Sequence, residues 1–470
     1  MNRFFKHLAL GTAAVCVLAV PALAADFTHC ADYLKDMGLF QGGADGYDLD
    51  RTPTRLEASV MLVRLLGAEE EAKAISTYTA PFTDVADWAK PYVQYLYDNG
   101  LSNGVGNGKF GSDSLCTAQQ YTTFLLRALG YSDAAGGDFT YATAMEFARN
   151  LGLVDMLNCD ENNFLRDNLA AMSFTALATK PKSGEADLLT KLVQNGAIAK
   201  DDAEMYLGFF SDYRDYAAAI TKANTDAAKM STDAGVALGM TLADMDFLTA
   251  SIDMTMAMES DLEHLDQMKL AYDMNMTLQI DPTMAAAMGL PEDQATMTQN
   301  MECWYADGYY YVKSGEDKVK VALSFEDVME QMPTSDLTAT AAQVEPLCAI
   351  ESLTKADNSD GTVSYTINYA TSSFNGMIDT ILSSLPTGTD TTANMAFNAL
   401  DAEIFFRGDS LSSMEVLMDM TTEVEGQSMG ISMVMVMDNI QTGDTVKVTL
   451  PSDLNTYPEV TAEDMGMVTQ

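Results

Sequence analysis

The chain has 470 residues, with 26 lysines and arginines against 68 aspartates and glutamates, which gives a formal net charge of −42. This excess of acid argues against binding to nucleic acid or to an anionic membrane surface, because both are polyanions. The length allows two or three domains, and a hydrophobic content of 47% suffices for buried cores.

Residues 1–25 have the pattern of a secretory signal peptide. Two basic residues precede an apolar run over 8–20, and residues 22–24 (Ala-Leu-Ala) form a small-residue cleavage pattern. We therefore expect a secreted protein. No later stretch reaches the roughly 18 uninterrupted apolar residues of a membrane-spanning helix, so no transmembrane segment is predicted.

Five scattered cysteines follow the signal peptide, and none forms a Cys-x-x-Cys motif. Because their number is odd, at least one is unpaired within the chain. Two interpretations remain open. In the first, Cys303 and Cys348 form a disulfide inside the last domain. In the second, the cysteines are buried free thiols.

Three related segments follow, at about 27–67, 82–130 and 139–180. The second reads as a helix, a glycine-rich loop and a second helix. Thr54 and Thr117 are 63 residues apart, and the same offset separates Arg64 from Arg127. A weaker third copy carries Arg166 in this register. One pair of helices cannot bury its apolar face alone, so the three copies are expected to pack around a shared centre as an all-α domain over 26–181.

The second copy resembles an S-layer homology (SLH) repeat. The resemblance is carried by Phe-Thr-Asp-Val at 82–85, Trp88-Ala, the glycine-rich turn and Leu-Leu-Arg-Ala-Leu-Gly at 125–130. It implies a module that binds a cell-wall polysaccharide, usually as a set of three repeats. In the family, a Thr-Arg-x-Glu motif opens the second helix, and its arginine holds a pyruvate-bearing sugar through a bidentate contact with the carboxylate.

Only the first copy keeps the full motif, as Thr54, Arg55 and Glu57. The second copy has Ala118 in place of the arginine, and the third has Asn168 in place of the glutamate. The resemblance thus implies wall-polysaccharide binding by Thr54, Arg55, Glu57, Trp88 and Arg166.

Structural readings of the same residues stay open. Thr54 and Glu57 also fit a helix capping box, and Trp88 could be an ordinary core residue. A degenerate SLH domain that serves as a spacer or a protein contact is the alternative to wall binding.

Residues 182–244 are predicted to form a helical connector, interrupted at Asn195-Gly196. From 245 the apolar period changes from 3.6 to 2, which is typical of one-sided β-strands. We expect an α+β domain over 245–458, a large curved antiparallel sheet with a hairpin turn at Asp307-Gly308, followed by a tail at 459–470. The predicted hairpin spans 302–312. The other predicted strands centre on 252–258, 270–280, 318–323, 363–369, 402–407, 414–422, 429–437 and 446–450, with helices near 325–332 and 373–385.

Methionines alternate along the predicted strands, as at Met254, Met256 and Met258. Because methionine is flexible, the pattern fits either an adaptable core or a cavity for an apolar ligand. The strand pattern, the aromatic hairpin at 304–312 and the late segment 439–451 resemble the half-barrel of lipoprotein carriers. That resemblance implies binding of a lipid or another apolar ligand.

Nothing in the sequence indicates an enzyme, a cofactor or a metal. After the signal peptide only His29 and His264 remain, in different predicted domains, which disfavours histidine triads and zinc sites. Gly-Asp-Ser-Leu at 408–411 lacks the downstream histidine that a hydrolase of that type needs. The acidic turn at 45–50 fits only part of a calcium loop.

Two functions therefore compete. In the first, SLH-like repeats attach a secreted protein non-covalently to wall polysaccharide, at the cell wall or S-layer, and display the half-barrel. In the second, the half-barrel carries or senses an apolar ligand and the repeats are a scaffold.

Overall fold

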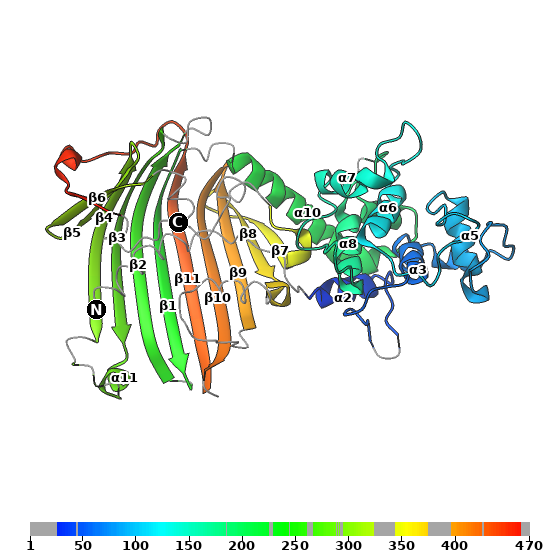
Figure 1. Cartoon of the computed structure of the whole chain (residues 1–470), viewed down its shortest axis with the longest axis horizontal. Coiled ribbons are helices and arrows are strands. Elements are labelled where there is room, and N and C mark those ends of the chain that lie inside the picture. The colour runs from blue at the N-terminus through cyan, green and yellow to red at the C-terminus, as the bar shows by residue number, and fades with distance from the viewer. Residues whose placement is uncertain are drawn as a thin grey trace.

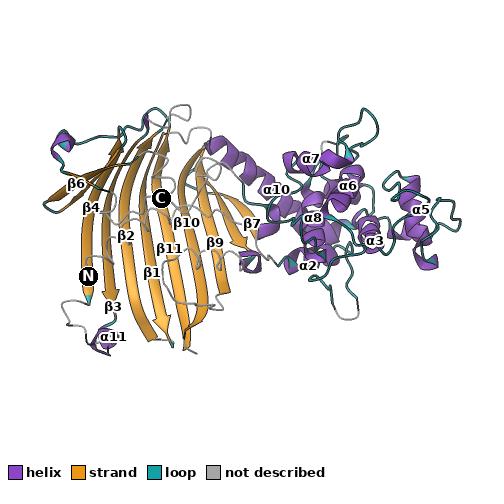
Figure 2. Cartoon of the chain, in the orientation of Figure 1, coloured by secondary structure: helices purple, strands orange, loops and turns teal. Residues whose placement is uncertain are grey.

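The computed structural model describes residues 26–43, 46–184, 186–224, 229–243, 245–260, 267–287, 289, 291, 295–323, 344–374, 396–424 and 427–461. Within these residues the chain has two parts, a helical N-terminal part and a curved sheet of 12 strands (Figures 1 and 2). The expected multidomain architecture is confirmed at this level. The predicted signal peptide and His264 lie outside the described residues.

The helical part consists of short helices. The α-helices are α2 (Thr28–Asp36), α3 (Arg55–Leu65), α4 (Glu69–Lys73), α5 (Lys90–Asp98), α6 (Ala118–Ala128), α7 (Ala144–Asn150), α8 (Arg166–Ala178), α9 (Leu188–Gln194) and α10 (Lys200–Asn224). Two 3-10 turns, η2 (Asp87–Ala89) and η3 (Tyr141–Thr143), lead directly into α5 and α7.

The local signals of the sequence fix where these helices begin and end. The hydroxyls of Thr54 and Thr117 accept the backbone N–H of the third helical residue of α3 and α6. Gly38, Gly100 and Gly152 follow α2, α5 and α7 with φ of 73°, 68° and 68°. A left-handed residue of this kind ends a helix, and glycine adopts it without strain.

Helix packing in this part is cyclic. Helix α3 packs against α5, α6 packs against α7, and α8 packs against α2. The second helix of each predicted copy therefore contacts the first helix of the next, and the last copy returns to the first. Leu62, Phe124 and Phe174, one from each of α3, α6 and α8, are fully or almost fully buried in the same core.

Helices α9 and α10 follow, with the predicted break between them at Asn195 and Gly196. Helix α10 runs from the helical part to the sheet, where it contacts β7 and β10 (Figure 1). The Tyr213 hydroxyl donates to the Glu345 carbonyl at 3.0 Å. The Tyr33 hydroxyl of α2 donates to the Glu351 carbonyl at 2.7 Å. Side chains of α2 and α10 thus bond to the backbone at and just before β7.

The sheet has the order β12-β6-β5-β4-β3-β2-β1-β11-β10-β9-β8-β7, and only the β12–β6 pair is parallel. The predicted hairpin at Asp307-Gly308 joins β4 to β5, with both residues at positive φ. The strands are β1 (Lys229–Leu242), β2 (Met245–Glu259), β3 (Lys269–Ile280), β4 (Thr296–Ala306), β5 (Tyr309–Ser314), β6 (Asp317–Ala322), β7 (Ile350–Asp357), β8 (Val363–Tyr369), β9 (Ala396–Arg407), β10 (Ser410–Val424), β11 (Gln427–Thr442) and β12 (Glu459–Val460). A short helix, α11 (Pro282–Ala287), follows β3, and 3-10 turns occupy Leu347–Ala349, Thr371–Phe374 and Leu454–Thr456.

Several sequence expectations need correction. The sheet begins at Lys229 and not at 245, because β1 lies in the segment that was predicted to be connector. Residues 446–450 form no strand. Strands β7 and β12 were not predicted, and β12 lies in the predicted tail. The helix predicted near 325–332 lies outside the described residues. So does most of the helix predicted at 373–385, whose first residues belong to a 3-10 turn.

All five cysteines described are free and buried, which agrees with the second of the two interpretations. Cys303 lies in β4 and Cys348 in the 3-10 turn before β7, close to the helical part.

Phe174 provides a test of the core. Its ring is fully buried in α8 and contacts the rings of Tyr33, Phe209 and Phe210 from α2 and α10. We expect Phe174→Ala to lower the free energy of unfolding by about 3–5 kcal/mol, because the substitution leaves a cavity. The control Met205→Ala, at a residue 67% exposed, should change it by less than about 0.5 kcal/mol. Denaturant titrations measure both values, and an equal loss of unfolding free energy in the two variants would contradict this packing.

Candidate functional site

Arg55 opens α3 and is 5% exposed. Its Nε donates to the Phe110 carbonyl at 2.9 Å, and its Nη2 donates to the Ser102 hydroxyl at 3.2 Å. The guanidinium carbon lies 4.6 Å from the centre of the Phe124 ring. Burial lowers the pKa of Arg55, but an arginine remains cationic at neutral pH because its ordinary pKa is so high. The cation is therefore held rigidly between two predicted repeats.

The loop that receives Arg55 is positioned by the Phe-Thr-Asp-Val segment. The Asp84 carboxylate accepts the backbone N–H groups of Phe110 at 2.7 Å and of Gly111 at 2.8 Å. These two bonds present the Phe110 carbonyl to Arg55.

Arg166 has the matching position at the start of α8 and is 7% exposed. Its Nε donates to the Tyr47 carbonyl at 2.8 Å, and its guanidinium carbon lies 5.8 Å from the Phe40 ring centre. Tyr47 and Phe110 each lie seven residues before the residue that caps the following helix. The two arginines thus bind equivalent carbonyls.

The backbone around each arginine repeats the same pattern. The N–H groups of Arg55 and Leu56 donate to the carbonyls of Ser114 and Ser112, and those of Arg166 and Asp167 donate to the carbonyls of Arg51 and Leu49. Ser112 is itself 4% exposed, and its hydroxyl has no hydrogen-bond partner among the described residues. At the third position Ala118 replaces the arginine, so the arrangement is complete at two of three junctions.

Charge pairing sets Arg55 and Arg166 apart from the other arginines. Neither forms an ion pair in the described part of the chain, whereas all other described arginines do. Those pairs are Arg51–Glu57, Arg64–Glu69, Arg127–Asp133, Arg149–Glu161, Arg214–Asp187 and Arg407–Asp360. In so acidic a chain, two buried arginines without a carboxylate partner are unusual.

Thr54 and Glu57 serve the helix. Thr54 accepts from the Glu57 N–H at 3.2 Å, and the Glu57 carboxylate accepts from the Thr54 N–H at 2.7 Å, which completes a capping box. Arg51 donates to both oxygens of the same carboxylate at 2.9 and 2.8 Å. These bonds lower the pKa of Glu57 to about 2. Both side chains therefore already have partners.

Trp88 lies on the 3-10 turn before α5 and is 62% exposed, so it is not a core residue. Its ring meets the Tyr92 ring edge-on at 6.4 Å. No described contact joins it to Arg55.

Sequence reasoning missed the groups that hold the two arginines, namely Phe40, Tyr47, Ser102, Phe110 and Phe124, although the constant offset between repeats was a usable signal.

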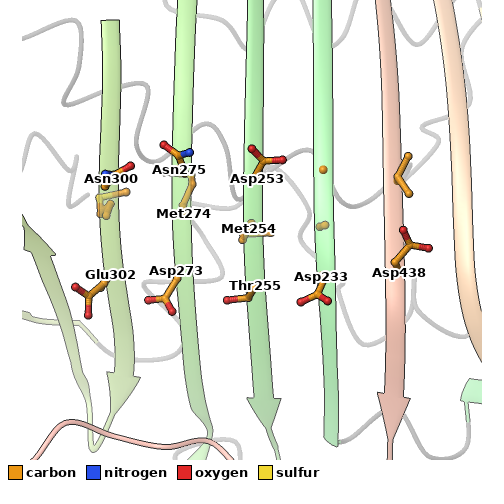
Figure 3. A pocket seen from close by; sticks show the side chains of 14 residues that line it. Asp233, Asp253, Met254, Thr255, Asp273, Met274, Asn275, Asn300, Glu302 and Asp438 are labelled. Atoms are coloured by element: carbon orange, nitrogen blue, oxygen red, sulfur yellow. The ribbon is translucent and has the colours of Figure 1, made fainter.

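The sheet carries a separate hollow of about 560 Å³ (Figure 3). Asp233, Asp253, Asp273, Glu302 and Asp438 line it from five neighbouring strands.

The described residues contain no group of three or more histidine, cysteine or acidic side chains that could hold a metal ion. In the acidic turn that was considered for calcium, Asp48 pairs with Arg51 at 3.6 Å. No described helix is both long and apolar enough to cross a membrane.

Comparison with known proteins adds two family models and several relatives. Residues 81–117 match the S-layer homology domain, and residues 240–455 match DUF6612, a family of unknown function. A cell surface protein of Thermoanaerobacter kivui is 32% identical over 177 residues, which cover 37% of this chain and 23% of that protein. A middle cell wall protein of Brevibacillus brevis is 27% identical over 160 residues, which cover 33% of this chain and 15% of that protein. The chain thus spans less than a quarter of either relative.

Among solved structures, LprF from Mycobacterium bovis covers 50% of this chain and 96% of its own length at 11% identity, with a TM-score of 0.20. A score this low carries no argument about a ligand. The domain match and the relatives define a protein of the cell surface and S-layer. More specifically, the chain carries an S-layer homology domain, matched inside the second predicted repeat.

Asp167, next to Arg166, gives a prediction about pH. Burial raises its pKa to about 7, and its carboxylate accepts the Phe27 N–H at 2.9 Å. Between the unfolded pKa near 4 and the folded pKa near 7, the folded chain holds a proton that the unfolded chain has lost, so stability falls as the pH rises. We expect Asp167→Asn to remove this slope, on the order of 1 kcal/mol per pH unit, while keeping the acceptor oxygen. The measurement is the melting temperature of both proteins between pH 5 and 7.5. The same change of melting temperature with pH in the two proteins would contradict the prediction.

Proposed function

We propose that the helical part anchors the protein non-covalently to a cell-wall polysaccharide that carries carboxylate groups, such as a pyruvylated polymer. The observation that carries the proposal is that Arg55 and Arg166 are the described arginines without an acidic partner. They occupy equivalent places at the starts of α3 and α8, between helix pairs.

The chemistry of these arginines suits a ligand carboxylate. A guanidinium already oriented by a carbonyl and an aromatic ring loses little freedom when it binds an anion. No hydrogen bond to Nη1 of Arg55 is found among the described residues, and the buried Ser112 hydroxyl nearby is also unpaired. We assign the recognition of the ligand's charge to Arg55 and Arg166, and contact with its sugar rings to the exposed Trp88. Thr54 and Glu57 are assigned the support of α3.

The remaining finer expectations belong to this proposal. Three SLH-like repeats over 26–181 are supported by the cyclic packing of α3 with α5, α6 with α7 and α8 with α2. A module with two complete arginine positions and one occupied by Ala118 would hold two ligands of this kind. The proposal assigns no catalytic role to the chain.

Sedimentation with purified wall tests the anchor. We expect the full chain to sediment with wall, and Arg55→Gln with Arg166→Gln to weaken this at least about tenfold, since a hydrogen bond between charged groups contributes roughly 1.5–3 kcal/mol. Arg149→Gln, at a half-exposed surface arginine, is the matched control. Far-ultraviolet circular dichroism must show that all variants are folded.

A second experiment uses only the natural protein and changes the wall instead. Wall from which the acid-labile pyruvate ketals have been removed should bind the natural protein at least about tenfold less than untreated wall. Unchanged binding to treated wall would refute recognition of the carboxylate, and unchanged binding of the double variant would refute the assignment of the two arginines.

A second candidate function is the carriage of an apolar ligand, and a methionine-rich face of the sheet supports it. Met254, Met274 and Met301 are direct cross-strand neighbours on β2, β3 and β4, and Met274 and Met301 are buried. This surface suits acyl chains because methionine adapts to irregular shapes. We expect native mass spectrometry of the full chain to show a bound lipid mass that is lost on organic extraction. A mass equal to that of the polypeptide alone would refute this candidate.

A further inference from the structure

The face of the sheet opposite the methionines is acidic. A band of seven acidic side chains crosses it from β9 to β4, and we call this band the acidic face. Its members are Glu403, Glu415, Asp438, Asp233, Asp253, Asp273 and Glu302. Figure 3 shows the last five of them on neighbouring strands. All are exposed or half-buried.

Basic residues are missing from the middle of this face. Along strands β9, β10, β11, β1, β2 and β3, the basic residues are Lys229, Lys269 and Arg407, each at the end of its strand. Glu302 pairs with Lys313 at the margin. The other six acidic side chains form no ion pair within the described residues.

Like charges also lie directly opposite each other. Asp233 is the register partner of Asp438, and Glu403 is the register partner of Glu415. Asp273 likewise faces Glu302, and burial together with this neighbouring charge raises the pKa of Asp273. Such pairs destabilise a sheet by themselves, so a positively charged partner would relieve a repulsion that the free protein carries.

Gly235 is a position on the acidic face without a side chain. It is the cross-strand partner of Asp253, and a Cβ at this position would meet nothing within 4 Å. Gly235 is one of the residues that line the hollow of about 560 Å³, together with Asn275 of β3 and Asn300 of β4. A long side chain from a partner can enter here and meet carboxylate and amide oxygens.

We propose that the acidic face docks a polypeptide segment rich in lysine or arginine. The seven strands that carry the acids span about 29 Å at the usual strand spacing, which is more than a small amine covers and suits a chain with several cations. Nucleic acids and anionic lipids would be repelled. So would a second copy of this chain, whose net charge is −42.

The test uses the full chain and a defined probe, octalysine, in titration calorimetry at low salt. We expect binding that weakens as salt is added, because exposed charges are screened. The triple variant Asp233→Asn, Asp253→Asn, Asp438→Asn should bind octalysine about tenfold more weakly. A matched triple, Glu71→Gln, Asp202→Asn, Glu204→Gln, removes the same charge from exposed helical residues and should bind within about twofold of the natural protein.

Four outcomes would overturn the proposal. They are no binding of octalysine at low salt, equal loss in the two triple variants, binding of spermine as tight as that of octalysine, and a melting temperature lowered by the Asp-to-Asn triple. The last would mean that these carboxylates stabilise the free sheet, whereas relief of like-charge repulsion predicts a melting temperature equal to or above that of the natural protein.

Discussion

The helical part depends on one repeated contact, in which the first turn of a helix accepts a loop from the neighbouring helix pair. At α3 and at α8 two backbone N–H groups and one buried guanidinium bind three carbonyls of that loop. The contact satisfies the free N–H groups at a helix start and fixes how neighbouring pairs pack. At the third junction, the start of α6, Ala118 stands where α3 and α8 have an arginine, so the guanidinium is missing there.

Charge is distributed very differently in the two parts. In the helical part most arginines are paired with carboxylates, and the two exceptions are buried at matching places. In the sheet the middle of one face carries acid without base, and the other face carries methionine. In the proposals made above, the anionic partner binds the helical part, and the cationic and apolar partners bind opposite faces of the same strands, β2, β3 and β4.

Much of this architecture could be predicted from the sequence, because the signals were local. The 63-residue offset located α3 and α6, the helix-ending glycines located α2, α5 and α7, and Asp307-Gly308 located a hairpin. Strand β1 was missed because it follows α10 closely and contains Gly235 and Gly239, which weaken a strand pattern. The burial of Arg55 could not be predicted from one repeat alone, because the carbonyl that it binds lies 55 residues away in another. The like-charge pairs of the sheet depend on strand register between distant segments, so spacing along the chain does not reveal them.

The contacts of α10 connect the helical part stiffly to the sheet. Tyr213 and Tyr33 donate to the carbonyls of Glu345 and Glu351, and Lys355 of β7 donates to Asp215 of α10 at 2.7 Å. A flexible tether would let the sheet sample every orientation, whereas several bonds at one joint transmit torque. Whatever surface holds the helical part therefore also sets the height and tilt of the sheet, and a force applied to the sheet is delivered to that attachment point.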